Sequence, residues 1–265
     1  MSRLPVNHLF AAARGFTLVE MMVALALGSL LAIVVAQLFA NTRTTNRATE
    51  DAARVQESMR YAAEVIGRTV RIAGYKSDPR ADSAVIFPAA ARALDGTNGT
   101  GTDSDTLIVR YQGAGAVTGT ADNTILDCLG AAVAPDYAGI AKAYNKFSVA
   151  TGANGRNALF CSTDPAVNPG TELVSGVEAM QVIFGEDTTT APGDGTADRF
   201  VPVGSVTNLD NVVAVRVYLL LSGSESVRLD TAAANYTVGG VAYSYSDAKV
   251  RRIVTYTVVL RNRAP

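Results

Sequence analysis

The sequence predicts an α+β protein in which a long N-terminal α-helix packs on an antiparallel β-sheet domain. An uncharged, apolar run of 22 residues lies at 21–42. Apolar and small residues at helical spacing then continue to Ala73. The rest of the chain contains short β-branched and aromatic runs, separated by Gly, Asn, Asp and Pro. No helical period joins these runs, so parallel crossover units are not expected.

The composition excludes several classes of protein. The 265 residues include 23 basic and 24 acidic side chains, a balance unlike that of a protein that coats nucleic acid. An apolar content of 48% excludes a disordered chain. A single histidine, His8, and two cysteines cannot supply a Ser-His-Asp triad, a His-paired thiol or a His-rich metal site. This count argues against most hydrolases and metalloenzymes and leaves an enzyme that uses only carboxylates open; we expect no enzyme activity and no cofactor.

The uncharged run at 21–42 is long enough to cross a membrane, because 22 helical residues span roughly 33 Å. Arg3 and Arg14 precede it, so the N-terminus is expected in the cytoplasm and the bulk of the chain outside. An ordinary signal peptide has a shorter apolar core, so we expect this segment to be retained. Glu20 at its head either has a partner or caps the helix at the lipid interface.

The segment Gly15-Phe-Thr-Leu-Val-Glu20, with a basic leader before it and an apolar run after it, resembles the class III signal of type IV pilins and pseudopilins. The resemblance implies that a prepilin peptidase cuts after Gly15 and that Phe16 becomes an N-methylated terminus. It also implies that Glu20 pairs with the terminal amine of a neighbouring subunit during assembly. The predicted fold is then a pilin fold.

The helix continues beyond the membrane segment with one apolar face. This face comprises Ala48, Ala52, Val55, Met59, Ala62, Ile66, Val70 and Ala73. Glu50 with Arg54, and Glu64 with Arg68, have the spacing of favourable helical ion pairs. Gly74 is a suitable stop. One helix is therefore expected from about residue 16 to residue 73.

Beyond the helix, four strands are expected, at 106–112, 177–184, 211–221 and 252–260, with a tight turn at Gly239-Gly240. Surface loops are expected at 94–105 and 185–199, and the region between Gln112 and Val174 shows little period. The predicted organisation is a leader (1–15), a membrane-spanning assembly helix (16–40), its soluble half (41–75) and a periplasmic head domain (76–265).

The soluble part carries a second resemblance, spread over most of the mature chain. The segments are 54–62, 71–75, 104–111, 173–182, 193–200 and 251–263, and they resemble PilW-type minor pilins. The resemblance implies a minor pilin that helps to initiate or complete a type IV pilus, with twitching motility, adhesion or DNA uptake downstream. Its location would be the inner membrane, with the head in the periplasm, and then the pilus on the cell surface.

The expected partners follow from that resemblance. They are other minor pilins and the major pilin, the prepilin peptidase, the inner-membrane assembly platform and inner-membrane lipid before assembly. Nucleic acid is not an expected partner, although the arginine-bearing face of the helix leaves it open. A minor pseudopilin of type II secretion is the alternative. A membrane-tethered periplasmic enzyme that uses only carboxylates, such as Asp103 with Asp105, is a remote one.

Cys128 and Cys161 face an oxidising compartment if the predicted topology holds, and a disulfide is then their natural state. The alternatives are two free thiols or a redox pair, although no C-x-x-C motif is present.

The acidic loop that contains Glu186, Asp187, Asp194 and Asp198 resembles a calcium-binding turn of some relatives. Calcium takes six to eight oxygen ligands, and only Asp194 and Asp198 keep the expected spacing. We expect a solvated loop without metal, with calcium as the minor alternative.

Overall fold

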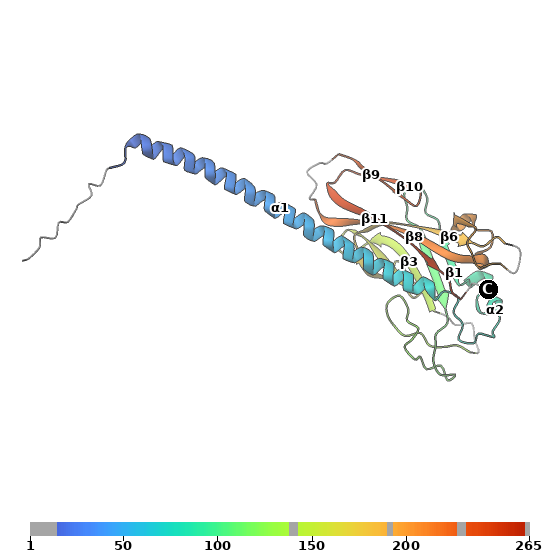
Figure 1. Cartoon of the computed structure of the whole chain (residues 1–265). Helices are drawn as coiled ribbons and strands as arrows, with labels where there is room; N and C mark the ends of the chain where they lie inside the picture. Colours follow the sequence, from blue (N-terminus) through green and yellow to red (C-terminus); the bar gives the residue numbers. More distant parts are fainter. Residues whose placement is uncertain (1–14, 138–142, 190–192, 227–231, 263–265) are drawn as a thin grey trace, which may run out of the picture. The chain divides into compact units, whose positions relative to one another are not determined.

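A computed structural model describes residues 15–137, 143–189, 193–226 and 232–262 (Figure 1). Most of the leader, residues 1–14, lies outside the described residues. The chain forms two compact units, 1–47 and 48–265. Helix α1 (Leu18–Arg71) contributes to both units.

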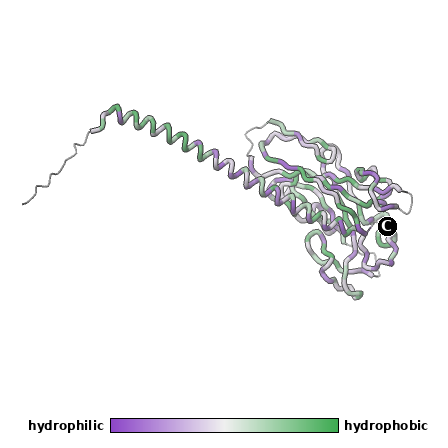
Figure 2. Tube along the Cα trace, viewed as in Figure 1, coloured by the Kyte–Doolittle hydropathy of each residue, from purple (hydrophilic) through white to green (hydrophobic). Residues whose placement is uncertain are grey.

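The first unit is the apolar half of α1. Its side chains are exposed from Leu18 to Thr45, including the large apolar ones. Figure 2 shows this half of the helix as predominantly hydrophobic. By length and composition α1 is sufficient to cross a membrane. A helix that is apolar on all sides needs lipid or other apolar helices around it.

The second unit contains two antiparallel sheets and a separate hairpin. The first sheet has the order β1 (Leu94–Thr97), β2 (Thr106–Tyr111), β3 (Ala143–Thr151), β4 (Asn157–Ser162) and β5 (Thr171–Ser175). The second has the order β11 (Lys249–Val259), β8 (Val212–Ser226), β6 (Val177–Glu186) and β7 (Arg199–Pro202). The hairpin is β9 (Ala234–Val238) with β10 (Val241–Tyr245).

Short helical segments complete the second unit. They are α2 (Ser83–Ile86) and three 3-10 turns, η1 (Ala89–Ala91), η2 (Val203–Ser205) and η3 (Leu209–Asn211). The side chain of Asp82 caps α2 by accepting a hydrogen bond from the Ala84 amide.

The core lies among the soluble half of α1 and the two sheets. The buried helix residues Val55, Ile66 and Val70 belong to one cluster with Phe147 of the first sheet and Phe184 of the second. The predicted apolar face of the helix is therefore the face that packs. The predicted fold class, a long helix packed on antiparallel β-structure, is confirmed.

The antiparallel β-structure is divided into two sheets and a hairpin, with more strands than the four that the sequence predicts. Strands β3, β4 and β5 come from the region between Gln112 and Val174, in which the sequence shows little period. Residues 158–162 of β4 are all buried, so the strand lacks the alternation that identifies a half-exposed strand.

Neither expected loop is wholly a loop. Residues 94–97 form β1, and Leu94 is fully buried. Gly96 resembles a loop residue in the sequence, but a Cβ on it would lie 2.3 Å from the Thr106 carbonyl oxygen of the paired strand. At the second loop, β6 extends to Glu186, whose side chain is buried.

The predicted helical ion pairs are also wrong. Within the described residues Glu64 pairs with Arg60, which also contacts Glu57, and not with Arg68. Arg68 instead donates a hydrogen bond to the Asp127 carbonyl oxygen at 3.1 Å. No ion pair joins Glu50 to Arg54 in this described part of the helix.

Two glycine predictions agree with the backbone. Gly74 has φ +74° directly after the last turn of the helix. Gly239 and Gly240, at φ +58° and +94°, form the turn between β9 and β10.

Candidate functional site

At the start of α1, Thr17 and Glu20 form a reciprocal cap. The Glu20 Oε2 atom accepts hydrogen bonds from the Thr17 amide and hydroxyl, both at 3.2 Å. The Thr17 hydroxyl oxygen accepts one from the Glu20 amide at 3.2 Å. This is the capping-box arrangement, which supplies partners for amides at the helix start. Glu20 therefore caps the helix, as one of the two interpretations of the sequence expected.

The cap uses one carboxylate oxygen of Glu20. Oε1 accepts no hydrogen bond from the part of the chain that the structure describes. Phe16 lies one residue before the cap with 88% of its surface exposed, and Gly15 is also exposed. The Gly15–Phe16 bond and one oxygen of Glu20 are thus accessible in this unit.

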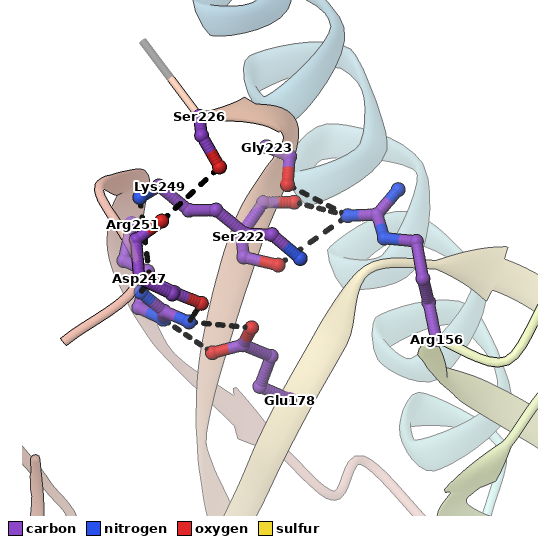
Figure 3. A network of polar contacts seen from close by, with 8 residues as sticks. All are labelled: Arg156, Glu178, Ser222, Gly223, Ser226, Asp247, Lys249 and Arg251. Carbon is purple, nitrogen blue, oxygen red and sulfur yellow. Dashed lines mark hydrogen bonds and ion pairs between the residues drawn. The ribbon is translucent and has the colours of Figure 1, made fainter. Parts of the chain in front are cut away.

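In the head domain, the end of β8 is fixed to two other elements. Asp51 of α1 accepts hydrogen bonds from the Ser224 amide at 2.9 Å and the Ser224 hydroxyl at 3.0 Å. Arg156, just before β4, donates to the carbonyl oxygens of Ser222 at 3.0 Å and Gly223 at 2.8 Å (Figure 3). These contacts join the helix, the first sheet and the second sheet.

A second polar cluster surrounds Arg251 of β11, whose side chain is 1% exposed. The guanidinium donates to both carboxylate oxygens of Glu178 and to both of Asp247 (Figure 3). It also stacks over the Tyr245 ring at 3.7 Å from the centroid. The hydrogen bonds from Arg251 hold the pKa of Asp247 below its usual range. The cluster ties the hairpin to the second sheet.

Cys128 and Cys161 form a disulfide, with their Cα atoms 6.4 Å apart. The bond links the segment before β3 to β4, and both cysteines are buried in the core. The disulfide expected from the sequence is present.

In the acidic loop, the two calcium candidates face the loop's own donors. Asp194 Oδ1 accepts hydrogen bonds from the Thr196 amide and hydroxyl. Asp198 Oδ2 accepts them from the Thr188 amide at 2.7 Å and hydroxyl at 2.9 Å. These hydrogen bonds lower the pKa of both carboxyl groups. Among the described residues, no three His, Cys, Asp or Glu side chains are grouped to hold a metal ion.

The other two acids of this loop are buried. Asp187 accepts hydrogen bonds from the Thr189 and Gly195 amides, both at 2.9 Å. Glu186 accepts hydrogen bonds from Arg199 and from the amides of Thr207 and Asn208. Burial opposes ionisation of Glu186, but these hydrogen bonds outweigh it and lower the pKa. Both acids shape the loop.

The Asp103–Asp105 pair does not form an acid–base site. Asp105 is buried, and its two carboxylate oxygens accept hydrogen bonds from the Gly99 and Val182 amides, both at 2.7 Å. Burial raises the pKa of Asp105. Asp103 contributes its carbonyl oxygen to the Gln181 side chain. Asp105 therefore fixes the connection before β2 to β6.

Sequence reasoning missed Thr17, Asp51, Arg156 and Arg251. The Thr-x-x-Glu pattern at 17–20 is a local signal that identifies the cap. Asp51 lies one helical turn before the buried Val55, on the face that packs, which marks it as a polar residue in need of a partner. No local pattern identifies the partners of Arg156 or the Glu178 partner of Arg251.

Two family models match the chain. The prokaryotic N-terminal methylation motif matches residues 11–36, and the family described as type IV pilus-assembly protein W, or PilW, matches residues 146–262. The comparison with curated proteins gave no match.

Among solved structures, the chain is similar to the type IV-like pilin TTHA1219 from Thermus thermophilus. The sequence identity is 14%, the TM-score is 0.44, and the alignment covers 80% of this chain and 99% of that chain. The chain is thus similar to type IV pilin-like proteins in its methylation motif and to PilW-type proteins over residues 146–262, and its helix packed on antiparallel sheets agrees with that likeness.

Proposed function

We propose that the chain is a minor pilin that helps to initiate or complete a type IV pilus. The observation that supports this role best is the combination of the methylation motif and the PilW-type region in one chain. The pilin family and fold point to a structural protein and not to an enzyme. A general role in the pilus follows from the family, and the position within it is our proposal.

The proposed processing site is the bond between Gly15 and Phe16. It lies inside the matched motif, next to an exposed Phe16 and before the first turn of α1. In this proposal prepilin peptidase removes residues 1–15, and the new Phe16 amine is methylated. Residues 16–40 form the membrane-spanning and assembly helix, 41–75 its soluble half and 76–265 the periplasmic head.

Glu20 has the proposed assembly role. Its Oε2 atom belongs to the cap, whereas Oε1 is available for the ammonium group of a neighbouring subunit. A carboxylate in an apolar environment gains most from a cation held in the same environment. The cap fixes the carboxylate at the helix start, so that it is placed before the partner arrives.

The proposed partners are other minor pilins, the major pilin and the assembly platform, with membrane lipid around the helix before assembly. On entry into the pilus, α1 would leave the lipid and pack against the helices of neighbouring subunits. Its exposed apolar side chains suit both surroundings, since both are apolar.

Deletion of the gene tests the proposal. Surface pili are counted by electron microscopy, and secretion is assayed in the same strain. Lost pili with normal secretion, restored by the wild-type gene, supports the minor pilin. Normal pili with lost secretion supports a type II secretion pseudopilin and contradicts our proposal, and so do normal pili with normal secretion.

A further inference from the structure

Strand β11 forms one edge of the second sheet, and among the described residues it pairs on one side only, with β8. The Leu260 amide donates to the Val213 carbonyl oxygen at 2.8 Å, which fixes the phase of the ladder. In an antiparallel ladder the N–H and C=O groups of one residue both point to the partner strand, and those of the next residue both point away. The backbone N–H and C=O groups of residues 254, 256 and 258 therefore face β8, and those of residues 253, 255, 257 and 259 face away.

The free edge lacks the usual protection against pairing with another strand. Residues 253–259 read Ile-Val-Thr-Tyr-Thr-Val-Val, without charge, Pro or Gly. The single irregularity of the ladder lies before them, between Lys249 and Arg251. Ile253 and Val259 are 39% and 57% exposed. Natural edge strands are normally blunted by charges, prolines or bulges, so this stretch is suited to accept a strand.

Positive charge lies at both ends of the free edge. Arg252 and Arg261 are exposed at its two limits. Arg216 of β8 lies beside it and donates from Nε to the Thr257 hydroxyl at 2.9 Å. Antiparallel pairing of two copies would bring Arg252 of one copy toward Arg261 of the other, and like charges across a pair are destabilising. The charges therefore favour a segment that carries acidic residues at its ends.

We propose that the free edge of β11, residues 253–259, accepts an extended segment of a neighbouring pilin subunit by β-strand addition, and that acidic residues flank this segment. Backbone hydrogen bonds would supply the attachment, and the arginines would select the partner. This inference rests on the proposed function, because it requires the chain to enter a pilus.

Residue-resolved hydrogen exchange tests the inference on the full-length chain, first in detergent and then in purified pili. Amides 254, 256 and 258 should be protected in both states. Amides 253, 255 and 257 should exchange fast in detergent and at least about tenfold more slowly in pili. Fast exchange of these three amides in pili that contain the chain overturns the inference and leaves the proposed function intact. Absence of the chain from pili overturns both.

Substitutions at Thr255 give an independent test. Thr255→Pro removes an outward amide and leaves the ladder with β8 intact, whereas Thr255→Val keeps that amide. Incorporation into pili should fall about tenfold for Thr255→Pro and stay near wild type for Thr255→Val, which is the matched control. An unchanged thermal midpoint in detergent shows that the Pro variant is folded. Equal incorporation of the two variants, when both are folded, overturns the inference.

Reversal of the flanking charges tests the choice of partner. The double variant Arg252→Glu/Arg261→Glu should enter pili less than wild type, and a photo-crosslinker at position 257 should capture a subunit segment flanked by Asp or Glu. Capture of a second copy of this chain would contradict the proposed partner, and so would unchanged incorporation of the double variant.

Discussion

Asp51 on α1 and Ser224 on β8 are joined by two hydrogen bonds, although 173 residues separate them in the sequence. Asp51 is 3% exposed, and its second oxygen, Oδ2, has no hydrogen-bond partner among the described residues. The contact fixes the packing of the soluble helix against the end of the strand, which makes it a suitable place to test how the helix is held.

Asp51→Ala should lower the free energy of unfolding of the head by about 1–3 kcal/mol, because the Ser224 amide loses its acceptor. Asp51→Asn retains an acceptor oxygen and should lose less. The measurement is thermal or chemical unfolding of the full-length chain in detergent. Glu57→Gln is the control: this residue forms an exposed ion pair with Arg60, and the loss of that pair should leave the stability nearly unchanged. Equal losses of unfolding free energy in Asp51→Ala and Glu57→Gln would contradict the role of Asp51 in holding the helix against β8.

Gly223→Ala should destabilise the head by about 1–3 kcal/mol, because the new methyl group overpacks the contact. Its Cβ would lie 1.7 Å from Asp51 Oδ2. The cost should be smaller in an Asp51→Ala background, and a double-mutant cycle measures this coupling. Gly204→Ala, where a Cβ meets nothing within 4 Å, is the control. Additive effects of the two substitutions would show that the contact is not the source of the cost.

Loss of the Cys128–Cys161 disulfide should lower stability by about 2–4 kcal/mol, since the unfolded chain regains the freedom of the closed loop. Reduction of the wild-type chain and the Cys128→Ser/Cys161→Ser variant should give similar unfolding midpoints. Reductant should leave the unfolding midpoint of the double variant unchanged. Mass spectrometry should show a two-dalton gain when the wild-type chain is reduced, and an unchanged mass would exclude the disulfide.

Acid should weaken the Arg251 cluster through Asp247. The hydrogen bonds from Arg251 lower the pKa of this carboxyl group in the folded chain, so the unfolded state binds its proton more readily. The resulting stability is present above the unfolded pKa, about 4, and is lost as the pH falls below it. Stability measured from pH 6 to pH 2 should fall less steeply in Asp247→Asn than in wild type. Parallel curves for the two proteins would show that Asp247 does not contribute.

Glu20→Ala should reduce entry into pili at least about tenfold, because the neighbouring amine loses its carboxylate partner in an apolar environment. Glu20→Gln keeps the cap to Thr17 and removes the charge, which separates the two roles of this residue. Both variants should still be processed, and the mature chain should begin at Phe16 by mass spectrometry. Wild-type incorporation of Glu20→Gln would assign Glu20 to capping alone.

The sequence predicts correctly those elements in which one face is buried and the other is exposed. The soluble half of α1 has one apolar face, and β2 alternates, with Leu107, Val109 and Tyr111 buried. Strand β4 escapes prediction because it is buried on both faces and does not alternate. Strand β1 is not predicted because a glycine in the sequence usually indicates a turn. Here Gly96 is required because the backbone of the paired strand lies too close for a Cβ.

The same division holds for the candidate sites. The motif at 15–20 is contiguous, so residue types and spacing identify it without a structure. Ser224, the partner of Asp51, lies 173 residues away, and Glu178, one of the two acidic partners of Arg251, lies 73 residues away; both are in strands whose pairing depends on the whole fold. Their residue types show only that a buried charge needs a partner. Tertiary packing determines which partner it is.

The Cys128–Cys161 bond also determines how the chain responds to tension. The two cysteines are 33 positions apart, and β3 lies within the closed loop. A force applied between the chain ends passes through the sulfur atoms and bypasses this loop. When the oxidised head is pulled apart, the chain therefore extends about 110 Å less than the reduced chain would, at roughly 3.4 Å per residue. The bond makes the oxidised subunit less extensible than the reduced one.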